Sequence, residues 1–212
     1  MDAALFDLDG TLINTELRSQ AVWARLLDRH GVSRDGGLLR GFIGRRGRDV
    51  LAERAELFPG KRIDDLIDEV VSFHNDPGLP EVEPVLGAAD LVRRVAEYGS
   101  SIAVVTSASR DWAEKRLAEV GVRDLVWTVV SAQDVTVGKP DPEGFLLAAA
   151  RLAVDPARCV AFEDSIAGIA AAKAAGMTCV GIATTHTDPE LAEADLVVTD
   201  LTEVDWPPSI IR

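Results

Sequence analysis

Residues 3–12, AALFDLDGTL, join a short apolar run to two aspartates and a glycine. The apolar run has the character of a β-strand that reaches Asp7, and Asp9-Gly10 predicts the loop that follows. Residues two apart on a strand point to the same face, so Asp7 and Asp9 can face one site. Open α/β sheets bind ligands beyond the carboxyl ends of their strands. A lone Asp-x-Asp is more often a strand that ends in an Asx-type turn, so the rest of the chain must decide.

Apolar residues recur with helical spacing between about residue 14 and residue 80. They predict helices over 14–30, around 38–42, and over 49–57 and 63–74. Residues 76–84 are rich in proline and glycine, which indicates a linker with a hinge at 78–84. We therefore expect residues 14–80 to form an all-helical cap that moves as a body on two hinges.

Helical patterns alternate with short apolar strands from Val85 onward. The sequence predicts strands at 102–106, 128–130, 160–162, 179–182 and 196–198, and helices at 87–98, 110–119, 142–152 and 166–175. This alternation indicates a parallel sheet with helices on both faces. The predicted fold class is α/β: a doubly wound parallel sheet formed by residues 1–13 and 85–212, with the helical cap inserted at 14–80.

Composition limits the classes of function. The 212 residues are 47% hydrophobic, enough for a large core. No apolar run approaches the roughly 20 residues of a membrane span, and the N-terminus lacks a basic signal-peptide region, so we expect a cytoplasmic protein without a membrane partner. Cys159 and Cys179 are expected to be buried free thiols. The net charge of −13 disfavours nucleic acid as a partner, and small size with an acidic surface favours a monomer.

Four of the predicted strand ends carry polar groups that suit phosphate chemistry. Besides the first aspartates, they are Thr106-Ser107-Ala108-Ser109, Gly138-Lys139-Pro140 and Glu163-Asp164-Ser165. Hydroxyls and N–H groups before a helix N-terminus favour anions, and the lysine adds a cation. Each segment alone is more often a helix cap or a solvated loop charge. Together, at the carboxyl ends of parallel strands, they can converge on one site.

The order of these motifs resembles the haloacid dehalogenase-like superfamily, over essentially the whole chain. The resemblance is to the branch with a helical cap inserted after the first strand, which includes β-phosphoglucomutase and many sugar-phosphate phosphatases. The motifs that carry it are Asp7-Leu-Asp9-Gly-Thr-Leu, Thr106-Ser107, Lys139-Pro140 and Glu163-Asp164-Ser165-x-x-Gly168. Residues 180–185, VGIATT, and 106–111, TSASRD, are also similar to the sugar- and polyol-phosphate phosphatases. These motifs specify the superfamily far better than the substrate.

The resemblance implies a Mg²⁺-dependent phosphatase that acts on a small phosphorylated metabolite, such as a sugar or polyol phosphate. Asp7 would attack phosphorus and form an aspartyl-phosphate. Asp9 would protonate the leaving oxygen and then take a proton from water. A carboxylate near a phosphate dianion is repelled by several kcal/mol at about 4 Å, so a cation is required. The implied Mg²⁺ ligands are Asp7, the backbone carbonyl of Asp9 and Asp164, with Glu163 direct or through water.

The other motifs are implied to hold the phosphate. Lys139 would hold the phosphate and Asp7 together, and its bond to Pro140 is a candidate cis peptide. Ser107 with the N–H of Ala108 would bind phosphate oxygens. The register of this motif is uncertain by one residue, which keeps Thr106 a candidate.

The fate of the phosphoenzyme depends on the cap. Mutases of this branch typically carry a histidine where this chain has Ser19, and an arginine where it has Gly47. Both differences favour a phosphatase over a β-phosphoglucomutase-type mutase. A non-catalytic binding module on the same fold stays open, although no motif residue is missing. A dehalogenase is a third alternative, but that branch needs no Mg²⁺ and its metal carboxylates are usually altered, unlike Glu163-Asp164.

Three cap arginines, Arg45, Arg46 and Arg48, are the candidate specificity residues. In one interpretation they are a solvated helix end paired with neighbouring acids. In the other, one of them faces the cleft and meets the distal hydroxyls or phosphate of the substrate. His74 and Asn75, near the second hinge, are further candidates that we expect at the surface.

Overall fold

The computed structural model describes residues 1–34, 36–42, 44–74 and 76–209. Six parallel strands form one sheet in the order β5-β4-β1-β6-β7-β8. Their bounds are β1 Ala3–Phe6, β4 Ser101–Val105, β5 Thr128–Val130, β6 Cys159–Glu163, β7 Thr178–Ile182 and β8 Leu196–Val198. The predicted α/β fold with a parallel sheet is confirmed, and the predicted strands differ from these by at most one residue at either end.

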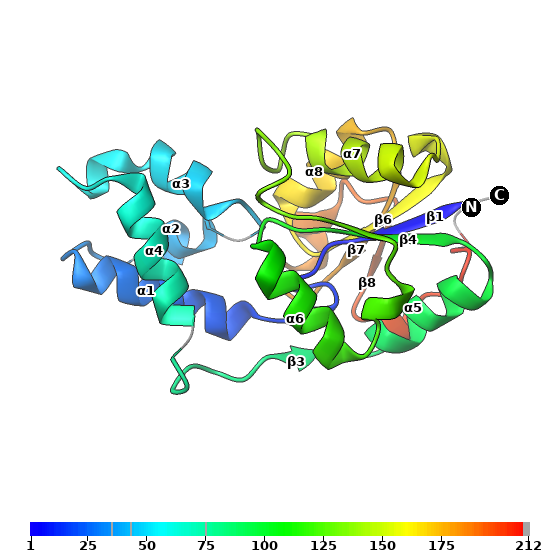
Figure 1. Ribbon diagram of the computed structural model, residues 1–212, viewed down its shortest axis with the longest axis horizontal. Coiled ribbons are helices and arrows are strands. Elements are labelled where there is room, and N and C mark those ends of the chain that lie inside the picture. Colours follow the sequence, from blue (N-terminus) through cyan, green and yellow to red (C-terminus); the bar gives the residue numbers. More distant parts are fainter. Residues whose placement is uncertain (35, 43, 75, 210–212) are drawn as a thin grey trace.

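Helices cover both faces of the sheet, because its strands are apolar on both sides. Alternate residues of β1 serve the two layers: Ala4 and Phe6 pack toward α5 and α6, while Ala3 and Leu5 pack toward α7 and α8. These helices are α5 Ala88–Glu97, α6 Arg110–Val120, α7 Glu143–Leu152 and α8 Ile166–Ala174. Figure 1 shows the two layers on opposite sides of the sheet. The central strand is thereby fixed by two hydrophobic cores.

The inserted helices form a separate lobe beyond one end of the sheet (Figure 1). They are α1 Glu16–Arg29, α2 Gly36–Arg40, α3 Gly47–Glu53 and α4 Ile63–His74, with a short 3₁₀ turn at Ala55–Leu57. The helix expected over 49–57 is therefore divided at Arg54. The lobe has its own core, in which Trp23 stacks on Phe42 with ring centroids 4.0 Å apart. An independent core is what a body that moves as a unit requires.

The two connections between the lobes pair with each other. Ile13–Asn14 (β2) and Glu83–Pro84 (β3) form a two-stranded antiparallel sheet, which the sequence did not indicate. The division into cap and core near residues 14 and 80, and the motion between them, stay predictions. Cys159 and Cys179 are buried and free, as expected. Within the described part of the chain, the helices are too short or too polar to cross a membrane.

Candidate active site

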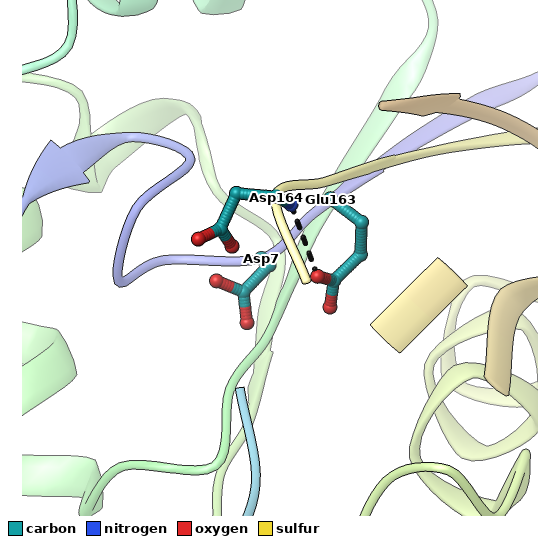
Figure 2. A group of neighbouring side chains, drawn as sticks. All are labelled: Asp7, Glu163 and Asp164. Atoms are coloured by element: carbon teal, nitrogen blue, oxygen red, sulfur yellow. Dashed lines mark hydrogen bonds between the residues drawn. The ribbon is translucent and has the colours of Figure 1, made fainter. Parts of the chain in front are cut away.

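The carboxyl ends of β1 and β6 meet at the switch point of the sheet. From β1 the chain adds β4 and β5 on one side and then returns to add β6 on the other, an arrangement that leaves a crevice for ligands. Asp7 directly follows β1, Glu163 ends β6, and Asp164 is the next residue. One oxygen from each of these carboxylates lies within 4.8 Å of the others (Figure 2). The fold thus brings together two segments more than 150 residues apart in sequence.

Lys139 joins this carboxylate group from the loop between β5 and α7. Its Nζ donates to Asp7 Oδ1 at 2.5 Å, to the carbonyl oxygen of Val105 at 3.1 Å, and to Glu163 Oε1. The expected cis peptide between Lys139 and Pro140 is confirmed. With all three carboxylates ionised, the Lys139 ammonium would balance only one of their three negative charges.

Both carboxylate oxygens of Glu163 accept hydrogen bonds from protein donors. Its Oε1 accepts from Lys139, while Oε2 accepts from the backbone N–H groups of Asp164 and Ser165 and from the Ser165 hydroxyl. A Cβ on Gly168 would lie 1.9 Å from Glu163 Cδ, so the motif glycine gives this side chain its space. Figure 2 shows the carboxylates of Asp7 and Asp164 next to each other, while the side chain of Glu163 curls back to accept from the backbone N–H of Asp164.

Burial and mutual repulsion perturb these carboxylates. Burial raises the pKa of Asp7 well above its usual range, and the charges of Glu163 and Asp164 act in the same direction, while Lys139 opposes them. Burial and the Glu163 charge raise the pKa of Asp164 to about 8. Burial by itself lowers the pKa of Lys139, but Asp7 and Glu163 outweigh it and raise that pKa. Oxygen donors with excess negative charge are the donor set that suits Mg²⁺.

Asp9 lies in the turn after β1, with its carboxylate outside that group. Since β1 ends at Phe6, strand alternation does not by itself place Asp9 beside Asp7, and a site shared by the two carboxylates stays a prediction. Asp9 Oδ1 instead accepts a hydrogen bond of 3.1 Å from Trp112 Nε1. Burial raises the pKa of the Asp9 carboxyl, while hydrogen bonds from Trp112 and Thr15 lower it.

Gly10 allows the turn to pass close to the carboxylate group. Its φ of +92° lies in the left-handed region, and a Cβ there would meet Asp164 Oδ2 at 2.0 Å. Any other residue would displace the aspartate. Gly10, which follows Asp9, therefore leaves the space that the Asp164 side chain occupies.

The expected phosphate-binding donors are engaged with other protein groups. Ser107 Oγ donates to the carbonyl oxygen of Gly44 in the cap at 3.3 Å, and the N–H of Ala108 donates to Thr106 Oγ1 at 3.0 Å. A cavity of about 20 Å³ beside them is lined by Arg46 and Lys139 among others, which is room for about one water molecule. The Ser107 hydroxyl has a single proton, so it can donate to a substrate only after its hydrogen bond to Gly44 breaks.

The three cap arginines each have an acidic partner. Arg45 pairs with Glu53, Arg46 with Asp49 and Arg48 with Asp64. Arg46 also donates to the carbonyl oxygens of Val135 and Thr136 at 2.9 and 2.8 Å, and Asp49 accepts from the N–H of Gly138 at 3.2 Å. Arg46 and Asp49 therefore bind the core loop that leads to Lys139. Direct contact of an arginine with substrate stays a prediction.

Three residues after β7 contact the site and were not assigned a role from the sequence. Thr184 donates to the carbonyl oxygen of Gly10, His186 donates from Nδ1 to that of Asp164 at 3.1 Å, and Thr185 bonds the Asp164 carboxylate. The sequence did contain an indication of such a role, because two threonines and a histidine lie at 183–186, directly after the strand predicted at 179–182.

One cap candidate, His74, differs from expectation, and one core residue had no expectation. The ring of His74 lies 5.2 Å from that of Trp112 and is partly buried, whereas we expected it at the surface. Asn75 lies outside the described residues. Trp112 was not singled out, and no motif would have indicated it, because its contact with Asp9 depends on how α6 packs.

A family model for haloacid dehalogenase-like hydrolases matches residues 1–176. The validoxylamine A 7'-phosphate phosphatase of Streptomyces hygroscopicus subsp. limoneus is 46% identical over 204 residues, with 96% of each chain covered. A fructose-1-phosphate phosphatase of Escherichia coli (strain K12) is 34% identical over 187 residues, which cover 84% of this chain and 94% of the relative. These similarities extend over both lobes.

A solved structure of a β-phosphoglucomutase from Clostridium difficile superposes with a TM-score of 0.84. The superposition covers 98% of this chain and 94% of the other, at 23% sequence identity. At that identity the likeness establishes a common fold and carries no information on the reaction.

Proposed function

Since this chain belongs to the haloacid dehalogenase-like hydrolases and is a phosphatase, we propose that it hydrolyses a sugar or polyol phosphate with Mg²⁺ through an aspartyl-phosphate. The observation that carries the proposal is the buried group in which Lys139 joins Asp7 to Glu163, beside Asp164. Buried, like-charged carboxylates are costly to stability, so their presence favours a catalytic role.

The metal would be held by Asp7 and Asp164 with the backbone carbonyl of Asp9. Asp7 and Asp164 are carboxylates of one buried oxygen-rich group, and burial and mutual repulsion raise the pKa of each, which a bound cation would counteract. Bound Mg²⁺ would reduce the repulsion between the Asp7 carboxylate and a phosphate dianion. We assign Glu163 a different part, because both of its oxygens already bind protein donors: it orients Lys139.

In the first step, an oxygen of Asp7 attacks phosphorus and the phosphorus–oxygen bond to the alcohol breaks. The alcohol oxygen takes a proton from the Asp9 carboxyl, whose pKa is raised by burial. In the second step, a water molecule attacks phosphorus and gives its proton to Asp9, and the bond to Asp7 breaks. Inorganic phosphate leaves, and both aspartates return to their initial states.

Lys139 and the end of β4 would bind the transferred phosphoryl group. The Lys139 ammonium lies against Asp7 Oδ1, where it can contact phosphate oxygens during attack. Ser107 would exchange the carbonyl oxygen of Gly44 for a phosphate oxygen when the cap loop moves, and the N–H of Ala108 would exchange Thr106 Oγ1 within the core. Preformed donors of this kind stabilise charge that develops in the transition state.

The substrate class is supported by the two named relatives, which are both phosphatases. Phosphate release should be measured with validoxylamine A 7'-phosphate, fructose 1-phosphate, hexitol phosphates and glucose phosphates, with Mg²⁺ and with EDTA. We expect release that depends on Mg²⁺ and is highest for one member of the panel. Conversion of a sugar 1-phosphate to its 6-phosphate without net release would identify a mutase instead. No turnover of any ester would refute the proposal.

A further inference from the structure

Helix α6 carries one aromatic side chain to the proposed acid–base residue. The hydroxyl of Ser109 caps this helix by accepting from the N–H of Trp112 at 3.3 Å, which fixes Trp112 in the first turn. From there the indole Nε1 donates to Asp9 Oδ1 at 3.1 Å. The two residues are 103 positions apart, so the contact is a product of tertiary packing.

The indole ring is held from two directions. Arg116, one helical turn later, places its guanidinium carbon 4.0 Å from the centroid of the ring. His74, the last residue of cap helix α4, lies against the ring at a centroid distance of 5.2 Å and an interplanar angle of 57°. Burial, with the charges of Arg18 and Arg116, lowers the pKa of His74 to about 4, so the neighbouring imidazole is neutral near pH 7. Trp112 is therefore a fixed donor that also touches the cap.

An indole N–H can only donate a hydrogen bond. It occupies an unprotonated oxygen of Asp9, so a transferable proton must sit on the other oxygen. It also adds no charge, whereas a lysine or arginine in its place would hold the carboxylate ionised. Because Asp9 follows the end of β1 in a turn, its side chain depends on hydrogen-bond donors to keep one orientation, and Trp112 is one of them, together with Thr15.

We propose that Trp112 is a positioning residue for the reaction, which orients the Asp9 carboxyl so that its second oxygen exchanges the proton with the leaving alcohol. This rests on the proposed function, in which Asp9 is the acid and base. The alternative is that Trp112 only fills space between α6 and the cap. The two differ in one respect: an orienting role matters most when the leaving alcohol needs a proton.

Trp112→Phe tests this, because it keeps an aromatic ring and removes the N–H. The ratio kcat/KM reports the steps up to release of the alcohol. We expect it to fall about tenfold for fructose 1-phosphate, whose alcohol is a poor leaving group, and less than about threefold for p-nitrophenyl phosphate. Equal losses on both esters, or no loss on either, would show that Trp112 only fills space.

Trp206→Phe is the matched control. Its indole Nε1 donates to Ser100 Oγ, also at 3.1 Å, at the opposite end of the sheet from Asp9. It should leave both values of kcat/KM unchanged. In an Asp9→Asn background, Trp112→Phe should cause little further loss, because the two changes remove one function. Losses that multiply would contradict the coupling.

The contact itself can be tested without turnover. The four tryptophans should give four indole N–H signals in a ¹⁵N–¹H spectrum, and Trp112→Phe identifies one of them. Asp9→Ala should shift that signal and leave the Trp206 signal in place. An unmoved Trp112 signal would overturn the proposal even in an active enzyme. Absence of any phosphatase activity in the wild type would instead refute the proposed function and, with it, this role of Trp112.

Discussion

The ion pairs of the core and those of the cap lie in opposite environments. The side chains of Lys139, Asp7 and Glu163 are 6%, 7% and 0% exposed, whereas those of Arg48 and Asp64 are 50% and 53% exposed. An exposed pair contributes at most about 1 kcal/mol to stability. A buried group with excess negative charge opposes folding, and loss of one partner leaves a buried charge uncompensated. The proposed chemistry therefore belongs to the core group. The cap pairs are expected to tolerate substitution better, with Arg46 between the two.

The largest effect should come from the core nucleophile. Asp7→Asn should lower turnover of every ester by more than about a hundredfold, because an amide cannot attack phosphorus. The fold should survive, which circular dichroism can verify. Retention of more than about a hundredth of wild-type activity would mean that the buried carboxylate group is structural, and the contrast with the cap would then lose its functional meaning.

Asp9→Asn should show which part of the core site handles the proton. The value of kcat/KM for a sugar phosphate should fall by about a hundredfold, and that for p-nitrophenyl phosphate by much less. The Mg²⁺ concentration for half-maximal activity should change little, because the backbone carbonyl is retained. Similar losses for the two esters would assign the acid to another residue.

Arg46→Ala and Arg48→Ala compare a cap arginine that binds the core with one that pairs within the cap. Arg46 binds backbone carbonyls of the core loop before Lys139, whereas Arg48 contacts Asp64 within the cap. We expect Arg46→Ala to lower kcat/KM several-fold on both sugar and p-nitrophenyl phosphates. Arg48→Ala should stay within about twofold of wild type. A loss confined to the sugar phosphate would indicate that the arginine contacts the substrate instead of the loop.

The smallest effect concerns stability without metal. The pKa of Asp164 rises from 3.8 to about 8 on folding, so between these values the folded chain binds more protons than the unfolded chain. Stability contributed by this group is therefore lost as pH rises. In EDTA, Tm should fall by a few degrees between about pH 5 and pH 8, and Mg²⁺ should raise it more at pH 8.

Asp164→Asn is the control for that measurement, because an amide does not titrate in this range. The variant should show a flatter dependence of Tm on pH and a smaller response to Mg²⁺. An unchanged pH dependence would mean that other groups dominate it.

Local sequence signals accounted for the sheet and for the segments that form the site. The alternation of short apolar strands with helices predicted the parallel sheet, and polar residues after apolar strands indicated Asp7 and Asp164, whereas Lys139 lies in the loop between β5 and α7. Such signals succeed because strand burial and turn chemistry are local properties. The division of the helix at 49–57, the pairing of β2 with β3 and the contact between Trp112 and Asp9 had no local signal. The last two join segments that are distant in the chain.

The sequence by itself determined the fold class, the family and the set of groups available for phosphate chemistry, because these depend on residue type and order. Tertiary structure decided how the groups are used. Glu163 and Asp164 are adjacent carboxylates in sequence, yet the start of α8 surrounds Glu163 with donors, and Asp164 lies next to Asp7. Arg46 and Arg48 are two residues apart, yet only Arg46 reaches the core loop. Hydrogen-bond geometry at a few ångströms separates these residues, and such geometry exists only after the strands and lobes have packed together.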